Sequence, residues 1–224
     1  MIINPYRFAA AGVAFDGFGN ASREFDGVSN KIQMGDVLDS VFAGTGKQFT
    51  ITAWINNDAL TNEIFISKWS TAGGRSFFLR VLSDGSFAVS MSSNGETSNR
   101  WGRVTDTSLI SANTWHHLAI TYDQTATGDY VRMWVDGVED ATLTAYLVNG
   151  TFTSIHDGTA SFDISGTDLT DTNDFDGHIA DVRVYDTDIP DSAIEGLAVG
   201  TDYQTNLVGW WITDVDDGTT TITD

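Results

Sequence analysis

Two runs of strand-forming residues between positions 114 and 138 constrain the fold of this chain most. The runs are Leu118-Ala-Ile-Thr-Tyr122 and Tyr130-Val-Arg-Met-Trp-Val135, and both are rich in β-branched and aromatic residues. A polar segment that contains Gly128 separates them. The second run stops at Asp136-Gly137, the dipeptide that most readily supplies the positive φ angles of a two-residue hairpin turn. We therefore expect neighbouring antiparallel strands here.

Similar runs recur along most of the chain. Alternation within 86–92 places Phe87, Val89 and Met91 on one face of a strand and small polar residues on the other. The 22 Gly and only 2 Pro suit many tight turns between uninterrupted strands. The predicted strands are 31–34, 48–55, 63–69, 76–82, 86–92, 100–104, 115–122, 130–135, 142–148, 161–165, 178–185 and 207–212.

One helix signal interrupts this series, near residues 190–198. Pro190 suits a first helical turn, Asp191 suits the positive N-terminal end, and Gly200 suits a stop. Many short strands with one short helix are typical of an all-β fold. We predict a two-sheet antiparallel jelly-roll sandwich.

Composition excludes several classes of protein. The net charge of −20 repels phosphate backbones, so we expect no nucleic-acid partner. No window approaches 18 apolar residues, so no membrane insertion is expected. Cysteine is absent, so no disulfide framework supports the fold. A chain of 224 residues with 41% hydrophobic content suits one sizeable core.

The chain is predicted to divide at its N-terminal end. Residues 1–22 read as an arm that a partner holds in place, because its head is apolar and aromatic. We expect the head to act as an anchor through Ile3, Pro5, Tyr6 and Phe8. Residues 23–224 then form the sandwich.

Five segments occur in an order that indicates a family. They are Phe25-Asp-Gly27, Phe49–Ile55, Trp115–Tyr122, Val131–Gly137 and Gly177–Tyr185. This series, over roughly residues 23–200, resembles the laminin-G-like members of the concanavalin A-like lectin/glucanase superfamily. The resemblance implies a jelly roll of two curved sheets that serves carbohydrate or protein adhesion.

One departure from the family pattern concerns residues 206–212. This segment looks like the strand that usually opens the family's domain, yet here it closes the chain. First and last strands are often neighbours in such sandwiches, so we expect 207–212 to pair within this domain as a closing strand. The alternative is the truncated start of a second repeat.

The resemblance also implies a structural Ca²⁺. Its ligands would be Asp181, Asp26 and the Gly27 carbonyl, because relatives hold the ion between early strands and a late Asp. The acidic loop 168–177, with Asp174 and Asp176, is a second candidate, since Ca²⁺ takes mixed oxygen ligands. The alternative for each Asp is a solvated turn.

Exposed aromatic residues are the candidates for ligand binding, because they can stack on sugar faces. Trp101 has polar neighbours, which favour exposure. Alternation within 130–135 places Tyr130, Arg132 and Trp134 together on one face of a strand. The concentrated arginines indicate an anionic group or a partner surface. Trp69, Trp210 and Trp211 are further candidates, and burial in the core is the alternative for every Trp. The predicted ligand-binding residues are Arg100, Trp101, Arg103, Tyr130, Arg132 and Trp134.

Catalytic patterns are missing from the sequence. The five Glu are isolated, and none lies in the Glu-x-Asp-x-x-Glu strand of superfamily glucanases, whose carboxylates must flank the glycosidic bond. His116 and His117 are adjacent on a predicted strand, so their side chains point to opposite faces and cannot share one metal. We predict that the protein is not an enzyme.

The N-terminal head, the lack of cysteine and the lack of a signal peptide resemble phage virion proteins. The leading prediction is a non-catalytic adhesion or structural module, made in the host cytoplasm and displayed on the virion surface. Its arm would bind capsid or tail proteins, its sandwich would bind host-surface glycans, and its copies would form a homo-oligomer. The alternatives are an exported, extracellular carbohydrate-binding module and, less favoured, a glycan-degrading enzyme.

Overall fold

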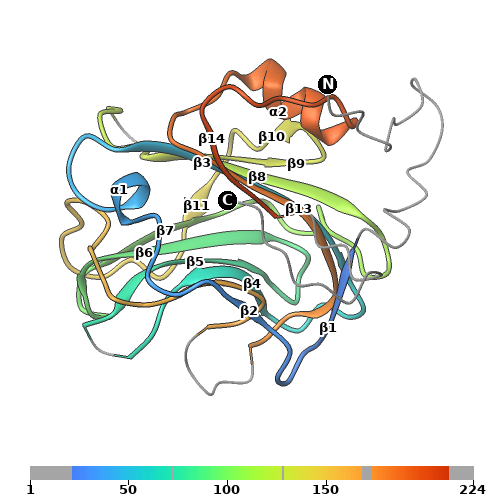
Figure 1. Ribbon diagram of the computed structural model, residues 1–224, viewed down its shortest axis with the longest axis horizontal. Helices are drawn as coiled ribbons and strands as arrows, with labels where there is room; N and C mark the ends of the chain where they lie inside the picture. Colours follow the sequence, from blue (N-terminus) through green and yellow to red (C-terminus); the bar gives the residue numbers. More distant parts are fainter. Residues whose placement is uncertain (1–21, 72, 128, 168–172, 212–224) are drawn as a thin grey trace.

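The computed structural model describes residues 22–71, 73–127, 129–167 and 173–211. Two antiparallel sheets of seven strands pack face to face (Figure 1), which confirms the predicted all-β sandwich. We call them sheet A and sheet B. The strands of sheet A are, in spatial order, β1 (Arg23–Asp26), β13 (Asp176–Tyr185), β3 (Gln48–Asn57), β8 (His116–Asp123), β9 (Val131–Val135) and β10 (Val138–Glu139), and β14 (Leu207–Trp211) also pairs with β13.

Sheet B is built mainly from the middle of the chain. Its order is β11 (Thr144–Ala145), β7 (Arg100–Val104), β6 (Phe87–Gly95), β5 (Arg75–Val81), β4 (Glu63–Lys68), β12 (Phe162–Ile164) and β2 (Ile32–Gln33). Most of these strands overlap the predicted ranges, and β1 and β10 are strands that the sequence did not predict.

The core lies between the sheets and follows the alternation in the strands. In β3, every second residue from Phe49 to Ile55 points into the core, while the residues between them point away from it. Phe77 and Leu79 of β5 face them from sheet B. Because successive strand residues alternate between faces, each sheet keeps a second, outer face. The two outer faces differ in what covers them.

Helix α2 (Asp191–Ala198) covers the outer face of sheet A (Figure 1). Ile194 and Leu197 of this helix pack in one cluster with Trp134, Ala119 and Tyr185 of the sheet. The predicted helix near 190–198 is therefore present, with its apolar side on the sheet. Neither described helix has the length and hydropathy of a membrane-spanning helix.

A second helix, α1 (Asp39–Phe42), was not predicted. Its four residues form a single turn, which is too short to show a helical period in sequence. Phe42 enters the core, and Lys68 Nζ lies 2.9 Å from Asp39 Oδ1. The first contact ties the turn to the core between the sheets, and the second ties it to β4 of sheet B.

The first and last described strands share one edge of β13. β1 begins with Arg23 opposite Ile179, and β14 ends with Trp211 opposite Val182. β14 thus pairs within this sandwich, as the closing-strand hypothesis requires. The boundary between arm and sandwich stays a prediction, because residues 1–21, with Ile3, Pro5, Tyr6 and Phe8, lie outside the described part of the chain.

The hairpin turn predicted at Asp136-Gly137 forms as expected. Val135 pairs with Val138, so Asp136 and Gly137 make a two-residue turn. Their φ angles are 53° and 78°, which is the conformation that an Asp-Gly pair adopts readily. This turn places the Asp136 carboxylate beside the start of β8.

Candidate ligand-binding surface on sheet B

The outer face of sheet B carries a cluster of arginine and aromatic side chains. Core residues Phe77 and Leu79 alternate with Phe78 and Arg80, so the latter point outward. Trp69 follows β4 and packs in the same outer cluster as Phe78. We define the sheet B arginine surface by five residues that share this face: Trp69, Arg75, Phe78, Arg80 and Arg100.

The aromatic rings form a floor on which the guanidinium groups lie. Trp69 and Phe78 meet edge to face, with ring centroids 5.0 Å apart. Arg100 Cζ lies 5.0 Å from the Trp69 centroid and 5.6 Å from the Phe78 centroid. Arg80 Cζ lies 5.5 Å from Phe78, and Arg75 Cζ lies 5.8 Å from Trp69. Contacts at this range are favourable between a cation and a ring face, and they fix the orientation of the planar groups.

The three arginines have few negative partners. Arg75 Nη1 lies 3.2 Å from Glu96 Oε2, and Glu96 is partly exposed. Arg100 donates from Nε and Nη2 to a neutral acceptor, Ser90 Oγ, at 3.3 and 3.1 Å. Among the described residues, Arg100 and Arg80 make no salt bridge.

Arg80 is held entirely by neutral oxygens. It donates to the Asn62 carbonyl and Asn173 Oδ1, both at 2.8 Å, and to the Tyr146 hydroxyl at 3.2 Å. Its Nε is buried and has no acceptor within the described part of the chain. Tyr146 also packs on the Trp69–Phe78 floor, so its hydroxyl lies beside the arginine cluster.

Close backbone approach brings Tyr146 to this face. Gly102 of β7 lies beside Ser90, and a Cβ at this glycine would meet Val89 O at 2.3 Å and Tyr146 O at 2.6 Å. Only glycine therefore lets the segment around β11 lie so close. The resulting surface is half-buried and has a neutral polar rim.

Burial lowers the pKa of the Arg100 guanidinium; Tyr146 opposes this effect, and the positive charges of Arg75 and Arg80 add to it. The three cations thus repel one another without enough internal carboxylates to offset that repulsion. Planar guanidinium groups in fixed positions are suited to bind an anion through paired N–H donors. The arrangement can therefore bind a negatively charged ligand.

The prediction that Trp101 is exposed is wrong. Its side chain is 8% exposed, because it pairs with Met91 and points into the core. There its ring packs against Tyr130 and Phe152. Arg103 stacks on Trp101 and pairs with Asp129 at the edge of the sandwich, away from the outer face. Polar neighbours in sequence did not reveal which face each residue takes.

The face predicted from Tyr130, Arg132 and Trp134 does not exist as a contact surface. Trp134 is 1% exposed, because α2 covers it. Arg132 is paired with Glu139 at 2.6 Å and with Asp191 of α2 at 2.7 Å. Tyr130 precedes β9 and packs against the core instead of sharing the face of the other two residues.

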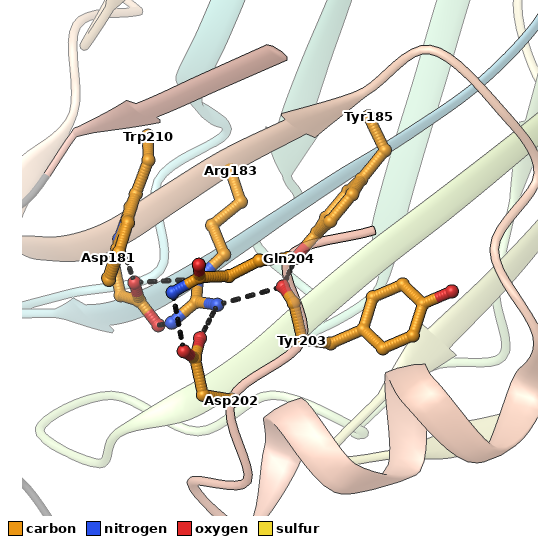
Figure 2. A network of polar contacts seen from close by, with 7 residues as sticks. All are labelled: Asp181, Arg183, Tyr185, Asp202, Tyr203, Gln204 and Trp210. Atoms are coloured by element: carbon orange, nitrogen blue, oxygen red, sulfur yellow. Dashed lines mark hydrogen bonds and ion pairs between the residues drawn. The ribbon is translucent and has the colours of Figure 1, made fainter. Parts of the chain in front are cut away.

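Two further tryptophan candidates, Trp210 and Trp211, are also structural. Trp211 is buried and stacks on Phe162. Trp210 donates from Nε1 to Asp181 Oδ1 at 2.6 Å and lies against Arg183, as Figure 2 shows. Arg183 in turn pairs with Asp181 and Asp202 at 2.9 and 2.6 Å. Of the predicted ligand-binding residues, Arg100 belongs to the sheet B arginine surface, and so does Trp69 of the further candidates.

The structure separates the predicted calcium ligands. Asp26 and Gly27 lie near Asp176, but Asp181 is five residues further along β13, which is about 16 Å in an extended strand. The Asp181 carboxylate is occupied by Arg183 and Trp210, and Asp26 accepts three backbone N–H groups. Asp174 is buried and lies just before Asp176 in the chain. Described residues contain no cluster of three metal-ligating side chains, and 168–172 lie outside them, so calcium stays a prediction.

His116 and His117 lie on opposite faces of β8, as predicted. His117 packs against Trp54, and burial lowers the pKa of its ring to about 3. His116 lies between Asp136 Oδ2, 2.8 Å from Nδ1, and Ser111 Oγ, 3.1 Å from Nε2. This order resembles a nucleophile, base and acid, but the Ser111 backbone N–H also donates to Nε2 at 3.1 Å. The ring thus ties the loop before β8 to the Asp136-Gly137 turn.

Sequence reasoning missed Arg75 and Arg80. One signal was available, because Arg80 alternates with Phe77, Leu79 and Val81, which belong to the core. A charged residue in phase with the non-core positions marks an outer face. The contact with Arg100, 20 or more residues away, requires the sheet order and could not be read from one strand.

The concanavalin A-like lectin/glucanases superfamily model matches residues 26–195. The chain therefore belongs to this superfamily, a class of jelly-roll sandwich proteins, which confirms the resemblance drawn from the ordered segments. A search of curated proteins found no match.

Solved structures share the fold at low sequence identity. A candidate carbohydrate-binding protein of Bacteroides ovatus ATCC 8483 is 21% identical with a TM-score of 0.55, over 84% of this chain and 50% of that one. The CBM40 of the Ruminococcus gnavus IT-sialidase, bound to α2,3 sialyllactose, is 14% identical with a TM-score of 0.54, over 79% and 97%. The binding domain of botulinum neurotoxin serotype G is 14% identical with a TM-score of 0.56, over 79% and 42%. This chain thus spans half or less of two of these structures, and the likeness concerns the fold.

Proposed function

We propose that this protein is a non-catalytic carbohydrate-binding module whose ligand lies on the sheet B arginine surface. The observation that carries the proposal is the pair Arg80 and Arg100, which are fixed on aromatic rings and make no salt bridge among the described residues. Several fold neighbours are carbohydrate-binding or toxin receptor-binding domains, which supports a binding role.

The polar rim of this surface suits sugar hydroxyls. The Tyr146 hydroxyl, Ser90 Oγ and the Asn173 amide all lie within hydrogen-bond distance of the arginines. Sugars are recognised by several such groups at once, with planar side chains beneath the ring. Because Trp69 and Phe78 are almost fully buried, the planar groups that are partly open to a ligand here are the guanidinium groups themselves.

A glycan array with the fluorescently labelled protein tests this function. We expect the wild type to bind a defined subset of glycans and Arg80→Ala to lose that binding. Lys47→Ala removes the same charge beside β3, where Lys47 contacts the loop at Gln124, and is expected to bind like the wild type. Equal binding by Arg80→Ala would contradict the proposed site, and the absence of any bound glycan would contradict the function.

The biological setting is a further part of the proposal. We place the module on a phage virion surface, with residues 1–22 on capsid or tail proteins and the sandwich displayed outward as a homo-oligomer. An exported extracellular module is the alternative. Mass spectrometry of purified particles separates them, because the virion model predicts this protein at constant copy number per particle. Its absence from particles would favour the exported module.

A further inference from the structure

We infer that the sheet B arginine surface selects sugars that carry a carboxylate, such as sialic or uronic acid residues. The inference rests on the proposed function and names its ligand class. It is carried by the unbalanced charge of this surface, by the geometry of its guanidinium groups and by the neutral groups that surround them.

The unbalanced positive charge of the sheet B arginine surface favours an anionic ligand. The chain has 31 acidic and 11 basic residues, so an arginine without a carboxylate partner is unusual in this protein. Arg75, Arg80 and Arg100 nevertheless share one face with a single salt bridge between them, to the partly exposed Glu96. Half-buried like charges are unfavourable unless an opposite charge is near. A bound anion would supply it.

The unused N–H donors of the guanidinium groups favour a carboxylate. Arg100 directs Nε and Nη2 to Ser90 Oγ, which leaves Nη1 with no described acceptor. Arg75 likewise uses only Nη1 in its contact with Glu96. Because both groups lie over the Trp69 ring, their unused donors belong to one small region. A planar carboxylate with two oxygens fits paired donors of this kind.

The neutral polar groups beside the arginines favour a sugar over a bare ion. Tyr146 and Asn173 hold Arg80 without adding charge, so the surface offers hydroxyl and amide groups directly beside the cations. An inorganic anion would need only the cations. An acidic sugar uses both kinds of group at once, since its ring hydroxyls lie next to its carboxylate. The surface therefore matches a charged sugar better than a bare ion.

The test is an array of glycans printed as matched pairs, each with a free carboxylate or the corresponding carboxamide, together with sulfated and neutral glycans. We expect the wild type to bind carboxylates at least about tenfold more strongly than carboxamides, which is the effect of one charge-assisted hydrogen-bonded pair. Arg100→Ala should remove this preference. Arg100→Lys should restore only part of it, because Lys has the charge without the fork.

The outcomes separate this inference from the proposed function. Binding to carboxamides and carboxylates alike, still lost in Arg80→Ala, would overturn the acidic-sugar inference and keep the carbohydrate-binding function. Preference for sulfated over carboxylated glycans would also overturn it. Circular dichroism of Arg100→Ala confirms that the variant is folded, and Lys47→Ala should keep the wild-type preference. A preference unchanged in folded Arg100→Ala would contradict the inference.

Discussion

The two outer faces of the sandwich use arginine in different ways. On sheet A, Arg132 bridges Glu139 and Asp191, and Arg183 bridges Asp181 and Asp202 (Figure 2). On sheet B, Arg100 rests on two aromatic rings with Ser90 as its side-chain hydrogen-bond partner. Both faces stack arginine on aromatic residues, but only sheet A supplies two carboxylates to each cation.

The pKa values follow this difference. Hydrogen bonds that Arg132 donates to Glu139 and Asp191 hold its pKa above the ordinary value, and the carboxylates near Arg183 overcome the opposing effect of burial on the pKa of that residue. Arg100 shows the reverse direction, because burial and two neighbouring cations lower its pKa. Arginines on sheet A are therefore stabilised by carboxylates of the fold, whereas Arg80 and Arg100 on sheet B have no carboxylate partner among the described residues.

The largest effect is expected at the covered face. Trp134→Ala should lower the free energy of unfolding by about 3–5 kcal/mol, since it leaves a cavity beneath α2. Urea denaturation measures this change. A loss below about 1 kcal/mol would contradict the packing of α2 on sheet A, because a buried Trp under a docked helix cannot be removed so cheaply.

A matched substitution on both faces sharpens the comparison. Arg183→Met should cost about 2–3 kcal/mol, somewhat below the range for a broken, fully buried pair, because Asp202 is 33% exposed. Arg100→Met should cost less than about 1 kcal/mol, since it removes a repelled cation and leaves a neutral partner. Thermal and urea unfolding of both variants provide the measurement. Equal losses on the two faces would remove the distinction.

The buried His117 on sheet A gives a pH dependence. Its pKa is lowered to about 3 from an ordinary 6.5, so between these values the unfolded chain binds a proton that the folded chain does not. This contribution is complete above pH 6.5 and is lost as the pH falls toward 3. The slope is about 1.4 kcal/mol per pH unit.

We expect His117→Leu to reduce this slope between pH 6.5 and 4.5, a window that lies within the two pKa values. Trp134→Ala, which removes no titratable group, serves as the control and should keep the wild-type slope. Urea unfolding at several pH values measures both. A wild-type slope in His117→Leu would contradict the assignment.

The smallest effect concerns Ser111. Because its own backbone N–H also donates to His116 Nε2, we expect the ring to act as a structural link and not as a general base. A fluorophosphonate probe should therefore leave Ser111 unlabelled after prolonged incubation, as read by intact-protein mass spectrometry. Covalent labelling that disappears in Ser111→Ala would contradict a non-catalytic protein.

Local patterns predicted the fold well. Alternation and turn residues located most strands, and Asp136-Gly137 formed the expected turn, because these features depend on neighbours in sequence. The helix α1 escaped prediction because one turn has no period. The family comparison supports the same sandwich over 26–195.

The candidate site was predicted only in Arg100 and in Trp69, which was a further candidate. The partners of Arg100, Arg75 and Arg80, come from another strand, and only the order β7-β6-β5 brings them to one face. Trp101 was placed on the surface because polar residues flank it, whereas its register with Met91 turns it inward. Which of two adjacent residues faces the core depends on tertiary pairing, and a single strand does not reveal it.

We propose that the outer faces of sheets A and B differ in whether their arginines are available to a ligand. The most direct test is to record the ¹H–¹⁵N signals of the arginine Nε groups while a carboxylated glycan selected on the array is titrated. We predict saturable shifts of the Arg75, Arg80 and Arg100 Nε signals, whereas the Nε signals of Arg132 and Arg183 should not shift. Shifts confined to Arg132 and Arg183, with the sheet B arginine surface unaffected, would contradict it.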